Sequence, residues 1–129
     1  MTLHELSFGK IIILKEDIAE VIINHGVELT GQLVDEYHDF LCNHLQVPFS
    51  LLVNKIHDYS YNFAAQKKLA AIPEINSMAV VVYKQASERV TQLLTVIPRE
   101  IDWNMKIFSD REMALAWVED NQTYVRKRA

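Results

Sequence analysis

A chain of 129 residues, half of them hydrophobic and 23% charged, has the composition of a folded globular protein and excludes a disordered one. Its net charge of −4 argues against binding to nucleic acid, because a phosphate backbone is bound by a concentrated basic face. Arg126, Lys127 and Arg128 form only a short basic run at the C-terminal end. We therefore expect a single domain over residues 1–129, with a core of about residues 8–120 and a short basic C-terminal tail.

The cellular compartment is predicted from cysteine usage and from the absence of targeting patterns. Cys42 is the only cysteine, so an internal disulfide is excluded and a reducing compartment is favoured. The first residues contain no basic segment followed by a long apolar one, which disfavours a secretion signal. The longest apolar runs, such as Met78 to Tyr83, are far shorter than the ~20 residues that span a bilayer. These features predict a cytoplasmic protein without a membrane span.

The N-terminal part predicts a hairpin followed by a helix. Two apolar runs, Phe8 to Leu14 and Ile18 to Asn24, are separated by a short polar turn, which is typical of a β-hairpin. From Thr30 the apolar residues recur about every four positions, which predicts an amphipathic helix with Thr30 as its N-cap and Pro48 just beyond its end. The expected inward stripe comprises Leu33, Tyr37, Leu41 and Leu45, flanked by Val34 and Phe40.

The middle of the chain predicts a strand, a loop and a second helix. The segment from Phe49 to Ile56 contains a continuous apolar run, the pattern of a strand covered on both faces. A polar and aromatic loop from His57 to Asn62 follows. We expect the second helix from about Asn62 to Ala71, closed by Pro73. Its inward side chains are expected to be Ala65, Leu69 and Ile72.

The C-terminal part continues the alternation of strands and helices. Met78 to Tyr83 is the most hydrophobic run and predicts the strand at the centre of the sheet, and residues 86–97 have helical spacing up to Pro98. A short strand from Met105 to Phe108 precedes a last helix, which a capping box of Ser109 and Glu112 introduces. The buried stripe of that helix is expected to comprise Met113, Ala114, Trp117 and Val118.

The predicted order of elements is therefore β-β-α-β-α-β-α-β-α. Strands and helices that alternate with short connections predict an α/β fold. We expect a mixed, mostly parallel sheet of about five strands with four helices, in which the opening hairpin is the antiparallel element.

This order, together with particular segments, resembles the SpoIIAA-like or STAS-like superfamily, and most closely its small stand-alone bacterial members, which are uncharacterised. The segments that carry the resemblance extend over residues 8–120 and are FGKIIIL, GVELTGQ, VPFSLLVNKIHDYSYN, INSMAVVVY and KIFSDREMALAWVED. They are structural in character and contain no catalytic motif. The resemblance implies a SpoIIAA-like fold and a regulatory role through protein interactions.

In anti-sigma-factor antagonists of this superfamily, a Ser or Thr that can be phosphorylated follows the third strand, and Ser60 is at the equivalent place. The antagonists have a glycine next to this Ser or Thr, whereas this chain has Tyr61 and Asn62 after Ser60. Phosphorylation of Ser60 would add negative charge near the start of the second helix. The alternative interpretation is that Ser60 simply caps that helix.

Loops after parallel strands are where open α/β sheets bind ligands or partners, so we predict a functional edge around the third strand. Aromatic residues with polar tips are favoured at interfaces, although here they could instead cover the end of the core. The predicted edge comprises Asn54, His57, Asp58, Tyr59, Ser60, Tyr61, Asn62 and Phe63.

Metal and enzyme chemistry are not expected. His38 and Cys42 are four residues apart on the first predicted helix, but His44 is not on their face, and with His25 they make no complete zinc motif. Cys42 is late in its helix, where the helix dipole disfavours a thiolate. There is no nucleophile elbow and no phosphate-binding glycine loop. We therefore expect no metal, no cofactor and no enzyme activity.

Two functions remain open at this stage. The first is a non-enzymatic interaction or regulatory module that acts through the edge from Asn54 to Phe63 and self-associates as a homodimer through an exposed strand. The alternative, implied by the resemblance, is a carrier of a small apolar or lipid-like ligand held between the sheet and the helices. The segment from Ile97 to Trp103 is either a lid or a subunit contact, or it is packed into the core, which we favour.

Overall fold

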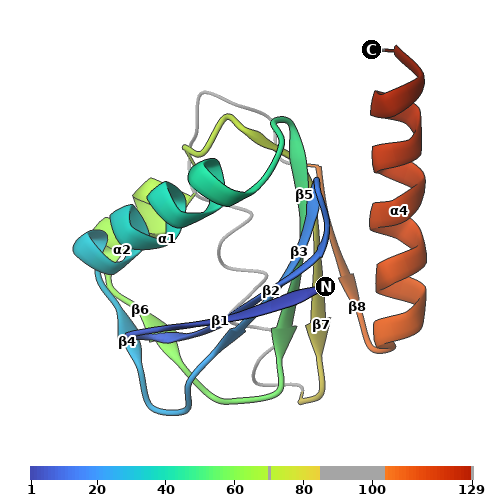
Figure 1. The fold of residues 1–129 in the computed structure, drawn as a ribbon. Coiled ribbons are helices and arrows are strands. Elements are labelled where there is room, and N and C mark those ends of the chain that lie inside the picture. The colour runs from blue at the N-terminus through green and yellow to red at the C-terminus, as the bar shows by residue number, and fades with distance from the viewer. Residues whose placement is uncertain (70, 85–103, 129) are drawn as a thin grey trace.

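A computed structural model describes residues 1–69, 71–84 and 104–128 of the chain. Its main feature is a six-stranded sheet with the order β1-β2-β3-β5-β7-β8 (Figure 1). The strands are β1 (Thr2–Leu6), β2 (Gly9–Lys15), β3 (Ile18–Ile23), β5 (Phe49–Lys55), β7 (Ile75–Val82) and β8 (Met105–Phe108). Two short segments, β4 (Glu28–Leu29) and β6 (Ser60–Tyr61), pair in parallel as a separate small sheet.

The main sheet is mixed, as the sequence predicts. β1, β2 and β3 pair antiparallel, and β3, β5, β7 and β8 pair in parallel. The predicted hairpin is confirmed as β2 and β3. The expectation of about five strands is wrong because β1 adds a sixth. β1 lies at the edge with mostly exposed or half-exposed side chains, so it lacks the apolar run that reveals an inner strand.

Three helices are present among the described residues, and they cover both faces of the sheet (Figure 1). α1 (Gly31–His44) and α2 (Phe63–Leu69) lie on one side, and α4 (Arg111–Arg128) lies on the other. The fourth expected helix, residues 86–97, and the segment from Ile97 to Trp103 lie outside the described residues. No helix in the described part of the chain is both long and apolar enough to cross a membrane.

The alternation of side chains along the inner strands divides the core into two layers. Leu51 and Val80 face α1 and α2, whereas Leu52 and Val81 face α4. This arrangement explains the continuous apolar runs of β5 and β7, because helices cover both faces. β7 lies between β5 and β8 rather than at the centre of the sheet, and Tyr83, just after it, is half exposed.

Helix starts follow local hydrogen-bond chemistry. The Thr30 hydroxyl accepts a hydrogen bond from the Leu33 N–H at 3.2 Å, so the predicted N-cap of α1 is confirmed. The predicted capping box of α4 is wrong, because Asp110 is the cap and accepts from the Met113 N–H at 3.1 Å. Both Ser and Asp are good caps, and the sequence does not distinguish adjacent candidates.

The buried stripe of α4 differs in part from the prediction. Ala114 and Val118 are fully buried as expected, but Met113 is 64% exposed. Trp117 is half-buried beside Phe108. One turn further along, Gln122 is completely buried and continues the stripe. An 18-residue helix that lies against a sheet buries only a narrow line of side chains, so its neighbouring positions remain exposed.

Gln122 is held in this layer by a satisfied set of hydrogen bonds. Its amide N–H groups donate to Asp17 Oδ2 at 2.8 Å and to the Pro48 carbonyl at 3.1 Å. Its amide oxygen accepts from Ser50 Oγ at 2.6 Å and from Asn76 Nδ2 at 2.9 Å. A buried polar side chain with all of these partners fixes the position of α4 without an unsatisfied group.

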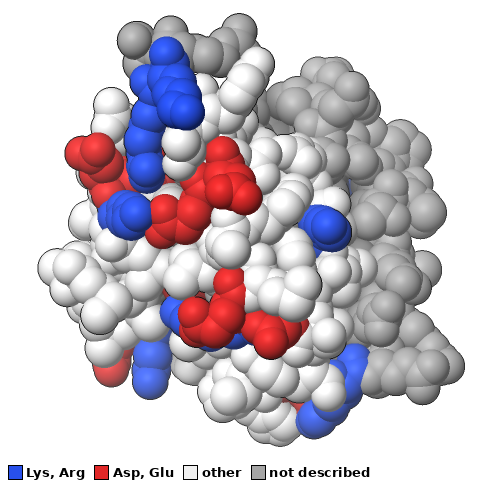
Figure 2. Space-filling view, turned by 90° about the vertical axis from the view of Figure 1, so that its right-hand side faces the viewer, with Lys and Arg blue, Asp and Glu red and all other residues white. Residues whose placement is uncertain are grey.

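Ion pairs connect α4 to the sheet and its turns on the side of the molecule that Figure 2 displays, where acidic and basic groups are interleaved. Lys15 binds Glu119 at 2.6 Å, and Arg126 forms an ion pair with the buried carboxylate of Asp17. α4 ends at Arg128, so the basic run from Arg126 to Arg128 is the end of this helix and not a separate tail.

Candidate functional site

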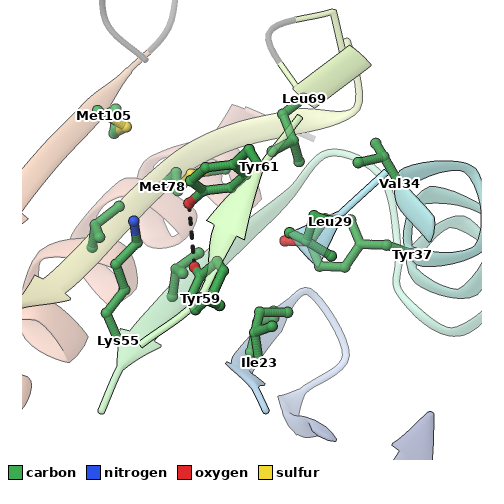
Figure 3. Close-up of a pocket in the computed structure, with 13 residues that line it drawn as sticks. Ile23, Leu29, Val34, Tyr37, Lys55, Tyr59, Tyr61, Leu69, Met78 and Met105 are labelled. Atoms are coloured by element: carbon green, nitrogen blue, oxygen red, sulfur yellow. Dashed lines mark hydrogen bonds between the residues drawn. The ribbon is translucent and has the colours of Figure 1, made fainter. Parts of the chain in front are cut away.

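A cavity lies between the face of the main sheet that carries α1 and α2 and the small β4–β6 sheet (Figure 3). Its enclosed space is small, ≈ 40 Å³, which holds about three water molecules, and the cavity opens to solvent on one side. Nearly all of its surface is apolar. The described residues that line it are Val21, Ile23, Leu29, Val34, Tyr37, Val53, Lys55, Tyr59, Tyr61, Leu69, Met78, Val80 and Met105.

The small sheet turns two tyrosines into this cavity. The Ser60 N–H donates to the Val27 carbonyl at 3.0 Å, and the Asn62 N–H donates to the Leu29 carbonyl at 2.9 Å. Side chains two residues apart on a strand point to the same side, so these two bonds place Tyr59 and Tyr61 together on the cavity side. The two rings pack edge to face with centroids 5.4 Å apart.

Gly26 allows the chain to reach this arrangement. It has φ of +79°, a backbone conformation that favours glycine, and its N–H donates to the Asp58 carbonyl at 2.8 Å. The bond ties the turn before β4 to the loop before β6. The walls of the cavity are thereby fixed by backbone contacts between two segments far apart in the sequence.

Lys55 is the only basic side chain among the described residues that line the cavity. The residue is only 5% exposed, and its Nζ lies 5.1 Å and 5.0 Å from the ring centroids of Tyr59 and Tyr61. In the described part of the chain it forms these two cation–π contacts and no hydrogen bond or ion pair. Burial lowers the pKa of Lys55 to about 8, so the ammonium is still mainly charged at neutral pH.

The two tyrosine hydroxyls add a polar group beside this cation. The Tyr61 hydroxyl donates to the Tyr59 hydroxyl at 3.3 Å (Figure 3). Burial raises the pKa of Tyr61 to about 12 and that of Tyr59 well above its ordinary value, so both stay neutral donors at physiological pH. The cavity thus combines an apolar wall with one cation and neutral hydroxyls, a combination suited to an anionic group on an apolar molecule.

The structure brings together only part of the predicted edge. Tyr59 and Tyr61 line the cavity, whereas Asn54 faces the other side of the sheet, where its Nδ2 donates to Glu20 Oε2 at 2.9 Å. His57 is exposed, and Asp58 is exposed and paired with Lys84 at 2.9 Å. Phe63, at the start of α2, is 71% exposed.

The interpretation of Ser60 as the cap of α2 is wrong. Asn62 is the cap, because its Oδ1 accepts a hydrogen bond from the Ala65 N–H at 2.8 Å. Ser60 lies in β6, exposed, in register with Glu28 of β4. A phosphate on Ser60 would therefore be added beside a carboxylate rather than at the helix start.

Sequence reasoning missed Lys55, although a signal was present. Along β5 the side chains of Phe49, Leu51 and Val53 all face α1 and α2, and Lys55 is the next residue in this alternation. A lysine that continues an inward apolar series marks a buried charge. The remaining walls come from β3, β4, α1, α2, β7 and β8, which only the fold brings together.

The comparisons with known proteins concern this fold. The structure superimposes on the crystal structure of an uncharacterized protein of the DUF3478 family from Shewanella loihica PV-4, which has a SpoIIAA-like fold. The TM-score is 0.54 at 17% sequence identity, over 92% of this chain and 97% of that one. No protein-family model matches the sequence, and no match is found among curated proteins. The fold is SpoIIAA-like, as the resemblance in sequence implies.

Proposed function

We propose that this protein binds a small amphiphilic ligand, with the apolar part of the ligand in the cavity and an anionic group at Lys55. The observation that carries the proposal is a buried ammonium without an anionic partner among the described residues, at the wall of an apolar cavity. It favours the ligand carrier over the interaction module, because the two tyrosines of the predicted edge face inward.

The energetic argument concerns the cost of keeping Lys55 charged. Removing an ammonium from water is unfavourable unless it is paired, which is why buried lysines are rare. The two tyrosine rings offset part of this desolvation free energy, about 0.5–2 kcal/mol for a cation–π contact. An anion supplied by a ligand would offset the remainder, and it would be bound more strongly here than at an exposed lysine.

A single carboxylate is the anion that suits this site best. Lys55 is a compact point charge, and no arginine that could bind a phosphate with paired donors lines the cavity among the described residues. The ammonium and a tyrosine hydroxyl offer one donor to each oxygen of a carboxylate. The proposed ligand class is therefore an apolar monocarboxylate of the fatty-acid type, with its carboxylate at Lys55 and most of its chain in the open mouth of the cavity.

Two measurements test this proposal. Native mass spectrometry of the protein purified from its own host should reveal a bound apolar acid. Titration of the delipidated protein with a medium-chain fatty acid should give one-to-one binding, which Lys55→Met weakens. Lys10→Met, at an exposed position of β2, is the matched control and should bind like the wild type. An apo mass together with no binding in the titration would refute the proposal.

A protein-interaction module is a second candidate, supported by the exposure of Ser60 and Phe63 beside the cavity wall. In this proposal Ser60 is a phosphorylation site and Phe63 is a contact residue, in a monomer or a homodimer. Pull-downs with the wild type, Ser60→Asp and Phe63→Ala would test it. Identical partner sets for all three proteins would remove this candidate.

A further inference from the structure

A second cluster of side chains with ligand chemistry lies near the C-terminal half of α1, at residues that do not line the cavity. It consists of His38, Cys42 and Glu74. One potential ligand atom from each residue lies within 4.8 Å of the other two, and all three residues are half-buried. We infer that these three side chains form a binding site for a divalent transition-metal ion of the zinc type.

The fold brings the three residues together from two segments. His38 and Cys42 are four residues apart on α1, so they lie on one face, one turn apart. Glu74 comes from the segment before β7, and its backbone carbonyl accepts a hydrogen bond from the Phe49 N–H at 3.1 Å. This bond fixes the glutamate to the start of β5. Two ligands on a rigid helix and a third on anchored backbone make a preorganised site.

The hydrogen bonding of Glu74 also points to a ligand. His38 Nε2 lies 2.9 Å from Glu74 Oε1, which satisfies one carboxylate oxygen. The other oxygen, Oε2, is buried and has no partner in the described part of the chain apart from the nearby Cys42 thiol, a weak donor. A buried carboxylate oxygen without a strong partner is unfavourable, and a metal ion would satisfy it.

The donor set selects the kind of metal. Imidazole nitrogen, thiolate sulfur and carboxylate oxygen are all ligands of Zn²⁺, whereas Mg²⁺ and Ca²⁺ take oxygen ligands. Around a tetrahedral Zn²⁺ the ligand atoms would be roughly 3.4–3.6 Å apart, from bond lengths of about 2.0–2.3 Å. The observed ligand atoms lie within 4.8 Å of one another, so binding the ion would draw them closer together. Three protein ligands leave a fourth position for water or another molecule.

Cobalt(II) is the sharpest probe, because it occupies zinc sites and gives a thiolate-to-metal charge-transfer absorption that zinc lacks. Cys42 is the only cysteine of the chain, so this absorption would report on one residue. The chelator-treated protein should bind one Co²⁺ with that absorption, and Zn²⁺ should displace it. Cys42→Ser should abolish the absorption.

His38→Gln and Glu74→Gln should weaken Co²⁺ and Zn²⁺ binding by at least about tenfold. His44→Gln, an exposed position on the same helix, is the matched control and should bind like the wild type. Circular dichroism would verify that each variant is folded. If the wild type gives no thiolate absorption, or if the His38 and Glu74 variants bind with unchanged affinity, the proposed site is refuted. Neither outcome would bear on ligand binding at Lys55.

Discussion

Arg111, the first residue of α4, donates two hydrogen bonds to the carboxylate of Glu20 in β3. Nη2 lies 2.6 Å from Oε1, and Nε lies 3.0 Å from Oε2. The Glu20 side chain is only 4% exposed, and Asn54 donates a third bond to it. Asn54, which the sequence suggested for a binding edge, therefore belongs to a polar contact between the sheet and the last helix.

Arg111→Ala should lower the free energy of unfolding by about 2–3 kcal/mol, because it leaves a buried carboxylate without its cation. Lys15→Ala, which breaks the more exposed pair with Glu119, is the control and should cost less than about 1 kcal/mol. Urea unfolding of the two variants measures the difference. Equal losses would contradict the importance assigned to the Arg111 contact.

The same contact predicts acid sensitivity. Burial acts to raise the pKa of Glu20, but the hydrogen bonds from Arg111 and Asn54 outweigh it and hold the pKa below its ordinary value of 4.5. A carboxyl with a depressed folded-state pKa stabilises the fold above that value, and this stabilisation is lost as the pH falls through the folded-state pKa. Glu20→Gln should therefore flatten the loss of stability below about pH 4.5, as measured by urea unfolding at several pH values. An unchanged pH profile would count against this role.

Asn62 and Ser60 make a second matched pair. Asn62→Ala removes the cap of α2 and should lower the free energy of unfolding by about 1 kcal/mol. Ser60→Ala changes an exposed side chain and should alter it by less than about 0.5 kcal/mol. Thermal unfolding of both variants would check this. A larger loss for Ser60→Ala would restore Ser60 as a structural residue.

The buried charge of Lys55 predicts a stability profile at alkaline pH. Its folded-state pKa is about 8 and its ordinary value is 10.5, so between these values the unfolded chain binds a proton that the folded chain does not. The free energy of unfolding of the ligand-free protein should therefore rise with pH across this window. Lys55→Met should remove the rise and should stabilise the protein at pH 7 by roughly 1–3 kcal/mol. A destabilised variant at pH 7 would contradict this account.

The core of the fold was accessible from the sequence because apolar periodicity is a local signal. The alternation of β2, β3, β5 and β7 with α1 and α2 follows from runs such as Leu51 to Val53 and from the Thr30 cap. β1 was missed because an edge strand with exposed side chains resembles a polar segment. Ser109 and Asp110 are equally good candidates for the cap of α4 in the sequence, and only the backbone geometry of the folded chain decides for Asp110.

The candidate sites were less accessible, because they depend on contacts between distant segments. The tyrosines Tyr59 and Tyr61 were recognised, but their inward direction follows from the pairing of β6 with β4. Glu74 is far in sequence from His38 and Cys42, so no local motif reveals that the three meet. Lys55 was not singled out from the sequence, although its place in the inward register of β5 is a readable signal.

The most direct test compares a straight-chain fatty acid with the alcohol of the same chain length, by calorimetric titration of the wild type and Lys55→Met at pH 7. We expect the wild type to prefer the acid, and Lys55→Met to lose about 10–100-fold in affinity for the acid while its affinity for the alcohol is unchanged or improved. Equal affinities of both proteins for the acid, or no binding of either ligand to the wild type, would contradict the assignment of Lys55 as the anion-binding group of a ligand cavity.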